Sequence, residues 1–381
     1  MNVPASHFFA FTPDTLKDWC ADRAMPAFRA KQILQWVYEK GVADPAQMTN
    51  LSANDRAMLA EDMTFLTGDT LHHQLATDGT QKLLVQWHDG DSERPAADQA
   101  NQAATAPTAE GLVSLPMLGE PDPTRQTECV MIPTESRKTA CISSQVGCPV
   151  GCRFCASGLG GLDGNLSVGR IIEQVWRLGR LPEVERISHV VFMGMGEPLA
   201  NFAAVEHAIR TLAAPWGMGI SARRITVSTV GLPKAIERLA DRLELPVTLA
   251  LSLHAPNDTI RRDLIPWAEY TSIDDLLGAC DKWFQKTGRE ITLEYILLRG
   301  VNDRPQDATD LAAIAKRIRA NVNLIRYNEV DGTPFGRPLD DDVRRFQHIL
   351  RTKNVNVHIR ASRGRDIAAA CGQLRHEAAN A

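Results

Sequence analysis

Three cysteines lie close together near the middle of the chain, in the run Gly147-Cys148-Pro149-Val150-Gly151-Cys152-Arg153-Phe154-Cys155. Their C-x3-C-x2-C spacing would also place small buried side chains along one face of a helix. Pro149 and Gly151 inside the run disfavour that helix. A loop instead lets three thiolates converge, and thiolate sulfur is a preferred ligand of zinc and of iron–sulfur clusters.

The number of cysteines helps to separate these two kinds of site. Structural zinc sites need four ligands, usually from two C-x2-C pairs, and the chain has no second pair. Three cysteine ligands leave one iron of a [4Fe–4S] cluster without a protein ligand. S-adenosylmethionine (SAM) needs such an open iron, because it binds the cluster through its amino and carboxylate groups. The run, with Phe154 before its last cysteine, resembles the radical SAM superfamily and predicts Cys148, Cys152 and Cys155 as cluster ligands. Zinc remains an alternative, in a non-catalytic RNA-binding module with Cys141 as fourth ligand.

Polar groups follow the strand-like runs on both sides of this loop. The glycines of Met193-Gly194-Met195-Gly196-Glu197-Pro198 would let backbone approach a ligand, and Glu197 could meet an ammonium group. Singly, such residues pass for tight turns, strand-end caps or a hydrogen-bonded histidine. Together they predict a SAM site at the carboxyl ends of the strands. The predicted SAM-binding residues are Gly196, Glu197, Ser228, Ser252, Leu253, His254 and Asn328.

These residues need a scaffold, and from about residue 127 strand-like and helical runs alternate. Six βα repeats imply an α/β fold with a parallel sheet, a partial (β/α)6 barrel of the TIM type. Strands are predicted near Thr139–Ser144, Ile187–Phe192, Arg224–Ser228, Val247–Leu253, Ile291–Leu297 and Val322–Tyr327. Helices are predicted near Ser167–Leu178, Phe202–Leu212, Pro233–Leu239, Ile273–Gln285 and Gln306–Ile318, with another after Asp340.

A smaller unit should precede this core, because 381 residues exceed the roughly 250 to 300 that one hydrophobic core usually serves. The pattern of residues 1–90 predicts a small, mainly helical accessory domain. One helix has its apolar face over Phe28–Lys40, and short strands follow near Leu71–Ala76 and Lys82–Trp87. Residues 91–126 are rich in Ala, Gln, Pro and acids and predict a flexible insertion. Residues 127–381 would form the core and its C-terminal extension.

Charge and hydropathy limit the partners. The 91–126 segment has six acidic and two basic residues, so it carries the whole net charge of −4 and the rest of the chain is neutral. RNA would therefore need local patches such as Arg223-Arg224, Arg261-Arg262 or Arg360–Arg365, although such clusters are often only solvated surface. The chain has no apolar run close to the ~18 residues that a membrane span needs, so we expect no membrane association. Four of its eight cysteines lie within one short stretch, which favours a cytoplasmic, reducing location.

Several motifs in order resemble the RlmN/Cfr family of radical SAM RNA adenine methyltransferases, and the likeness covers nearly all of the chain from Glu128 onward and the helical front. The matching runs are Cys141 with Ser143-Ser144-Gln145-Val146-Gly147-Cys148, Gly194-Met195-Gly196-Glu197-Pro198, Ser252-Leu253-His254-Ala255-Pro256-Asn257-Asp258, Gly300-Val301-Asn302-Asp303 and Ala370-Cys371-Gly372-Gln373-Leu374. The sequence departs from the family around Tyr327-Asn328-Glu329 and in its longer insertion.

The resemblance implies that one SAM methylates Cys371 and that a second, cleaved at the cluster, gives a radical that removes hydrogen from this methyl group. The methylene radical then adds to adenine, whose electrophilic C2 cannot attack a sulfonium methyl directly. Cys141 matches the cysteine that forms a disulfide with Cys371, and Glu128 matches the proton acceptor. Unaided, Cys371 would pass for a small buried side chain in an Ala-rich helix ended by Gly372, and Glu128 for an ordinary strand residue. Cys20, Cys129 and Cys280 match no family role and are taken as structural.

The implied activity is C2 methylation of an adenosine in 23S rRNA, with an adenosine of tRNA anticodon loops as a second target. We also expect the chain to act as a monomer and to receive its electrons from a flavodoxin-type protein. The antibiotic-resistance branch, which methylates C8 of the same base, is the alternative within the fold. A radical SAM enzyme for a protein or a small molecule is a third possibility, but it would have no evident use for Cys371 paired with Cys141.

Overall fold

A computed structural model of the chain describes residues 6–88 and 122–374. Its main feature is one curved sheet of ten strands in the order β1-β2-β3-β4-β7-β8-β9-β10-β11-β12. Strands β1 to β4 pair antiparallel, whereas β4 and all strands after it in this order pair parallel. The strands are β1 Gly68–Leu75, β2 Gln81–Trp87, β3 Gln126–Pro133, β4 Lys138–Cys141, β7 His189–Phe192, β8 Ile225–Thr229, β9 Thr248–Ser252, β10 Thr292–Leu297, β11 Asn321–Arg326 and β12 Val357–Arg360.

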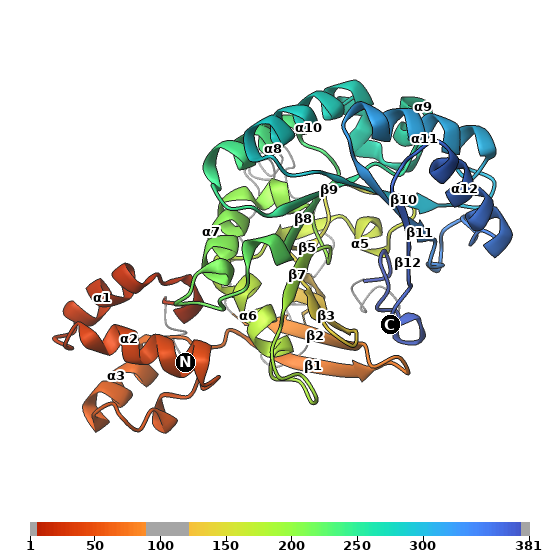
Figure 1. Cartoon of the computed structure of the whole chain (residues 1–381). Helices are drawn as coiled ribbons and strands as arrows, with labels where there is room; N and C mark the ends of the chain where they lie inside the picture. Colours follow the sequence, from red (N-terminus) through yellow and green to blue (C-terminus); the bar gives the residue numbers. More distant parts are fainter. Residues whose placement is uncertain (1–5, 89–121, 375–381) are drawn as a thin grey trace, which may run out of the picture.

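The parallel part confirms the predicted barrel. Each of the six expected strands forms, from β4 to β11, and β12 adds a seventh that was not predicted. In the described residues β1 and β12 are the two unpaired ends of the sheet, so the barrel is partial. The predicted helices also form, and Figure 1 shows them along the outer side of the strands. They are α6 Val168–Leu178, α7 Phe202–Ala213, α8 Pro233–Arg242, α10 Ile273–Thr287, α11 Pro305–Arg317 and α12 Asp340–Thr352.

Local sequence explains where these helices begin and end. Ser272 caps the start of α10, where its hydroxyl accepts from the Asp275 amide and the Asp275 carboxylate accepts from the Ser272 amide. Gly288 ends α10 in the left-handed conformation, with φ 64°. Between helices and sheet lies a core of fully buried side chains such as Leu249 and Leu293. Burial on both faces is what runs of consecutive apolar residues in parallel strands predict.

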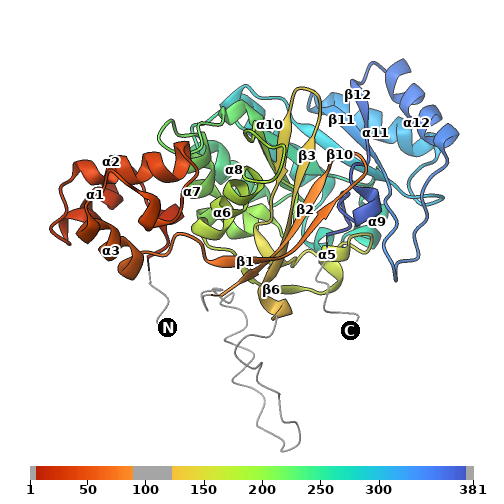
Figure 2. The same ribbon diagram turned by 90° about the horizontal axis from the view of Figure 1, so that it is seen from below.

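The helical front begins with α1 Pro13–Ala21, α2 Phe28–Leu34 and α3 Ala53–Asp62. These helices lie at one end of the molecule, away from α11 and α12 (Figure 2). The helix expected over Phe28–Lys40 forms, but its second half, Gln35–Glu39, is π-helical. Phe28 was expected on the buried face and is instead 59% exposed, because α2 begins at this residue and turns its first side chain outward.

Strands β1 and β2 were assigned to the accessory domain, yet they continue the core sheet. Strand β2 pairs antiparallel with β3, and all of its residues are buried. The insertion expected at 91–126 lies mostly outside the described residues, but its end is ordered. A 3-10 turn covers Pro123–Arg125, and Gln126 pairs with Gln86 in the sheet. We therefore propose that the helical unit ends before Gly68 and that the insertion connects two neighbouring antiparallel strands.

One buried carboxylate joins the helical front to the core. Glu173 of α6 accepts hydrogen bonds from the Thr67 amide (2.8 Å), the Thr67 hydroxyl (2.7 Å) and the Gly68 amide (3.3 Å). It also lies 3.3 Å from His7 and 2.7 Å from Arg177. Burial alone would raise the pKa of Glu173, but the His7 contact, the charge of Arg177 and the Thr67 amide together lower it. The ionised carboxylate is thus stabilised by residues from both parts of the chain.

We predict that Glu173→Gln lowers the free energy of unfolding by about 3 kcal/mol at neutral pH, because Arg177 loses its buried partner. The folded-state pKa of Glu173 lies below its ordinary value of 4.5, so this stability is fully present above that pH and is lost as the pH falls through the folded pKa. Urea unfolding followed by tryptophan fluorescence at several pH values should therefore show the two proteins converging in acid.

Glu237→Gln is the matched control. Glu237 lies 2.6 Å from Lys282, but both side chains are substantially exposed, and such a surface pair contributes about 1 kcal/mol at most. An equal loss of stability in the two variants, or a difference that does not change with pH, would contradict the role assigned to Glu173.

Candidate active site

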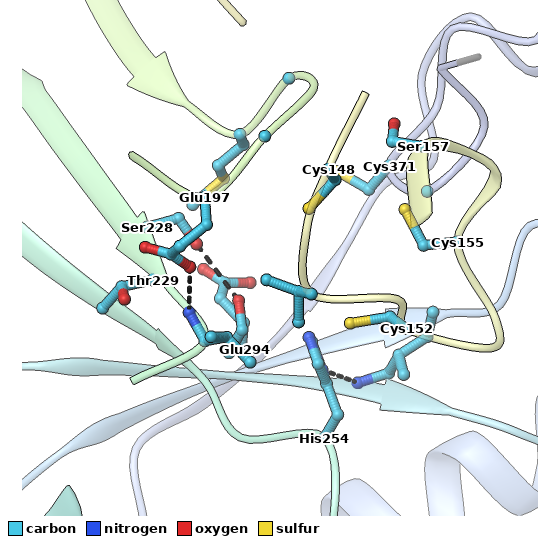
Figure 3. Close-up of a pocket in the computed structure, with 18 of the residues that line it drawn as sticks. Cys148, Cys152, Cys155, Ser157, Glu197, Ser228, Thr229, His254, Glu294 and Cys371 are labelled. Carbon is cyan, nitrogen blue, oxygen red and sulfur yellow. Dashed lines mark hydrogen bonds between the residues drawn. The ribbon is translucent and has the colours of Figure 1, made fainter. Parts of the chain in front are cut away.

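The three-cysteine run is a loop, as predicted. It follows the short strand β5 Gln145–Gly147, which pairs with β6 Leu162–Asn165, and it ends at the short helix α5 Ala156–Leu159. Gly147 starts the loop at φ 73°, and a Cβ on it would lie 2.1 Å from the Gly161 carbonyl oxygen. Only glycine fits there. All three cysteines line one cavity, and Figure 3 shows their sulfur atoms along its wall.

The donor set fits a cluster better than a single ion. Among the described residues no three His, Cys, Asp or Glu side chains are arranged to hold one metal ion, and Cys141, the proposed fourth zinc ligand, does not line this cavity. The cubane places each thiolate on a different iron, so the sulfurs need not converge on one point. Burial raises the pKa of the Cys148 thiol to about 12 and also raises those of Cys152 and Cys155. These thiols would be neutral until a metal displaces their protons.

Glu197 faces the cysteine loop across the cavity (Figure 3). It follows β7, and its two carboxylate oxygens accept from the Leu199 amide at 2.9 Å and from the Val230 amide at 2.7 Å. Burial raises the pKa of Glu197 to about 7. An ammonium group would favour the ionised form of this carboxylate, so the position is compatible with the predicted contact to the amino group of SAM.

Gly196 also lines the cavity, but its main constraint lies behind it. It has φ 101°, and a Cβ on it would lie 2.7 Å from the Cβ of Gln145. At Gly194 a Cβ would lie 2.7 Å from the carbonyl of Ile142. These glycines therefore allow the loop after β7 to pack against the strand that leads to the cysteines, besides leaving room for a ligand.

The ends of β8 and β9 supply the hydroxyls that were expected. Ser228 and Ser252 both line the cavity, with their Oγ atoms 3.2 Å apart. Thr229, beside them, lines it too. Paired hydroxyls of this kind can donate to and accept from a sugar or an amino-acid group.

His254 lines the same cavity and is held rigidly. Its Nδ1 accepts from the Ile296 amide at 3.1 Å, and its carbonyl oxygen accepts from the Asn302 side chain at 2.8 Å. Phe154 packs edge-on against its ring, with centroids 5.1 Å apart. Burial, with a further contribution from Arg261, lowers the pKa of His254 to about 3. The ring is therefore neutral, and Nε2 carries the remaining proton.

Two of the predicted SAM-binding residues lie elsewhere. Leu253 is fully buried and does not line the cavity, and its amide donates to the carbonyl oxygens of Leu251 and Glu294. Asn328 lines a second, adjacent cavity, where its Nδ2 donates to the Cys371 carbonyl oxygen at 3.3 Å. A direct contact of either side chain with SAM stays a prediction.

Cys371 lies between the two cavities and lines both. Cys141, at the end of β4, lines the second one with it, although 230 positions separate the two residues in sequence. Burial raises the pKa of the Cys141 thiol to about 12. All eight cysteines are free, so the disulfide implied by the resemblance is not formed in this structure. Topology nevertheless brings the two thiols to one site.

The segment around Cys371 is not the helix that its alanines predicted. It is an irregular loop after the 3-10 turn Arg365–Ile367. The Gly372 carbonyl oxygen accepts from the Ala156 amide at 2.8 Å, and the Leu374 carbonyl oxygen accepts from the Ser157 hydroxyl at 2.5 Å. Besides short turns within the segment, the backbone thus bonds to the helix after the cysteine loop.

Glu128 lies on β3, and its side chain is 1% exposed. Its Oε1 is 2.6 Å from the ammonium of Lys82 on β2, and it lines neither cavity. The backbone around it is tied to the site, because the Glu128 carbonyl oxygen accepts from the Ser143 hydroxyl at 2.6 Å. Lys82 had no predicted role.

Sequence reasoning misplaced some of the basic residues. Arg360 was a candidate for RNA contact, yet it lines both cavities and lies 3.3 Å from Glu294 and 3.4 Å from the Met193 sulfur. Arg261 is buried and donates to the Val230 carbonyl oxygen at 2.6 Å. The one sequence signal for the inward position of Arg360 and Arg261 is that each lies at or after the end of a strand. Arg223 and Arg224 are exposed just before β8, at the amino ends of the strands, where they line a third cavity together with Glu294 and Arg360.

Comparisons with known proteins agree with this geometry. The family model described as the radical SAM superfamily matches residues 142–312, and the model of the ribosomal RNA large subunit methyltransferase N-terminal domain matches residues 7–64. A protein of Rhodopirellula baltica named "Probable dual-specificity RNA methyltransferase RlmN" is 41% identical over 97% of this chain and 91% of its own length. A protein of the same name from Synechococcus sp. (strain CC9311) is 42% identical over 94% and 95%.

A solved structure extends the likeness to three dimensions. The crystal structure of a radical SAM methyltransferase from Sphaerobacter thermophilus superimposes with a TM-score of 0.86 at 37% identity, covering 98% of this chain and 100% of the other. Both the helical front and the barrel are therefore shared. The chain belongs to the RlmN family of radical SAM methyltransferases.

Proposed function

We propose that this chain methylates C2 of an adenosine in 23S rRNA and also, as a second target, of an adenosine in tRNA anticodon loops. The observation that carries the proposal is the position of Cys371, which lines the cavity of the three cysteines on one side and the cavity of Cys141 on the other. A thiol placed there can receive a carbon from SAM in the first cavity and present it to a base in the second.

Membership in the radical SAM superfamily implies a [4Fe–4S] cluster and SAM as cofactors. Cys148, Cys152 and Cys155 would hold the cluster, and Glu197, Ser228, Ser252 and His254 offer polar groups for SAM on the facing wall. The cluster, when bound, supplies the electron that cleaves SAM and so makes hydrogen abstraction from an unactivated carbon possible. Because the His254 ring is neutral and fixed, it adds no positive charge of its own beside the SAM sulfonium.

The remaining roles belong to residues beside Cys371. Cys371 would take up the methyl carbon and form the bond to the base. Cys141 would then attack the Cys371 sulfur, so that an S–S bond forms as the bond between sulfur and the transferred carbon breaks. The carbon would keep this electron pair and take up a proton, which completes the methyl group on the base. Glu128 would accept the proton that leaves the base. The disulfide must be reduced by an external donor before the next turnover, and we propose a flavodoxin-type protein for the electrons.

The RNA must present the target base unstacked, because the second cavity is lined by protein on the inner side of the sheet. The RlmN name of the relatives favours C2 over the C8 chemistry of the resistance branch. We propose that the chain acts as a monomer in the cytoplasm. Among residues 6–88 and 122–374, no helix is long and apolar enough to cross a membrane.

The direct test is anaerobic incubation of the reconstituted protein with SAM carrying a trideuterated methyl group and unmodified 23S rRNA. We predict 2-methyladenosine that keeps two of the three deuterium atoms, because one is removed before transfer. Mass spectrometry of digested nucleosides measures this. An 8-methyladenosine product would assign the chain to the resistance branch, and SAM cleavage with no methylated adenosine would refute RNA as the substrate.

Replacement of Cys371 separates RNA methylation from other radical SAM chemistry. Cys371→Ala should lower 2-methyladenosine formation by at least ~10³-fold, since no other thiol lines both cavities and a covalent route needs its nucleophile. Cys280→Ala, a small change in a fully buried helix residue, is the control and should retain turnover. Unchanged methylation by Cys371→Ala would instead favour an enzyme without a protein-bound carbon carrier.

The cluster assignment has an independent readout in metal content. After anaerobic reconstitution, we predict four iron atoms per chain and the brown absorption of a [4Fe–4S] protein, because three thiolates and an open iron suit that cluster. Cys148→Ala should lose most of both, whereas Cys129→Ala should keep them. A colourless protein that binds one zinc ion per chain would contradict the assignment.

A further inference from the structure

The turn between β1 and β2 holds the loop that carries Cys371. The Thr77 amide donates to Asp366 Oδ2 at 2.9 Å, and the Gly364 amide donates to Asp78 Oδ2 at 3.1 Å. These two contacts join segments almost 290 positions apart in the chain. The hairpin was expected in the accessory domain, yet it directly borders the site.

Lys82 makes a third contact with this loop, from inside the sheet. Its ammonium lies 3.4 Å from the Ala368 carbonyl oxygen and 2.6 Å from Glu128 Oε1. The side chains of Lys82 and Glu128 are 5% and 1% exposed. An ammonium so far from water needs charged and polar partners at close range. Lys82 therefore has two fixed partners, a carboxylate and the loop backbone.

The loop conformation near Cys371 depends on such contacts. Ala368, three positions before Cys371, has φ 49°, in the left-handed region that non-glycine residues rarely adopt. The Ala369 amide donates to the Gly364 carbonyl oxygen at 2.8 Å, which closes a tight turn. The Lys82 ammonium bonds the carbonyl of this strained residue, so it favours the backbone arrangement that places Cys371 between the two cavities.

We propose that Lys82 is a positioning residue that holds both the Glu128 carboxylate and the Cys371 loop in fixed places. The inference rests on the proposed function, in which Glu128 accepts a proton and Cys371 carries the transferred carbon. Without the ammonium, the Glu128 carboxylate would lose a charged contact at 2.6 Å and the Ala368 carbonyl oxygen would lose one at 3.4 Å, so Lys82 would no longer hold either group in place. Because one ammonium holds both groups, Lys82 links the position of the base to that of the thiol.

The first test needs neither cluster nor RNA. In the apo protein, the rate of Cys371 alkylation by iodoacetamide is measured by peptide mass spectrometry. Lys82→Met should raise this rate several-fold because the loop is released, and Lys82→Arg should stay near the wild-type rate. Lys282→Met is the matched control, since Lys282 lies at the same 2.6 Å from a carboxylate but on the surface. Equal alkylation rates in Lys82→Met and the wild-type protein would show that Lys82 does not hold the loop.

Removal of one member of a buried charge pair can prevent folding. The double variant Lys82→Met/Glu128→Gln removes both charges and avoids this. Compared with Glu128→Gln alone, it should still alkylate several-fold faster at Cys371. The same rate in these two proteins would show that Lys82 does not fix the loop.

The second test follows separate steps in the reconstituted protein with unmodified 23S rRNA. Lys82→Met should cleave SAM at wild-type levels but form 2-methyladenosine at least tenfold more slowly, with a protein–RNA conjugate accumulating on denaturing gels. Lys82→Arg should restore product. Wild-type turnover by Lys82→Met would refute the inference, whereas failure of the wild-type protein to make any methylated adenosine would refute the proposed function instead.

Discussion

The close contact between the strand that leads to the cysteines and the loop after β7 determines the geometry of the whole site. Residues 142–145 and 194–197 bond to each other almost as two strands do. The Gly194 amide donates to the Ile142 carbonyl oxygen at 3.0 Å, and the Ser144 amide donates to that of Met195 at 2.9 Å. A Cβ at Gly194 would remove this approach. The contact places Glu197 opposite the cysteine loop, with the cavity between them. The proposed cluster ligands and the carboxylate proposed to bind SAM therefore depend on Gly194 and Gly196.

Around this contact, charges are buried in pairs. Glu128 pairs with Lys82, Glu294 with Arg360, and Glu173 with Arg177. Such pairs contribute little net stability compared with apolar packing, but they impose a definite geometry, because each charge tolerates only one arrangement of partners. The first contacts the loop that carries Cys371, the second lines the cavities beside it, and the third joins the helical front to the barrel. Polar groups inside the fold are thus concentrated where position matters for chemistry or for assembly.

The position of Cys371 gives these features a common purpose. Its loop bonds to the helix after the cysteine loop through Gly372 and Leu374, and to the β1–β2 hairpin through Gly364 and Asp366. A carbon carrier that serves two cavities in turn must be accessible from both and yet held in place. Attachment at both ends of a short irregular loop meets this need better than a helix, because a helix would direct its backbone bonds to itself and leave the side chain on one face.

The sequence alone predicted the six βα repeats of the core, which the structure confirms, and the cluster ligands, which stay a prediction. The six βα repeats and the C-x3-C-x2-C loop depend on local periods and local spacing, which survive in any tertiary context. The roles of Cys141, Cys371 and Glu128 came only from family resemblance, since nothing local distinguishes them. Tertiary structure alone decided that β1 and β2 join the core sheet, that Arg360 lies inside instead of on the surface, and that Lys82 reaches both Glu128 and the Cys371 loop. Strand pairing and the burial of a charge depend on partners tens to hundreds of residues away, and no pattern within one segment records them.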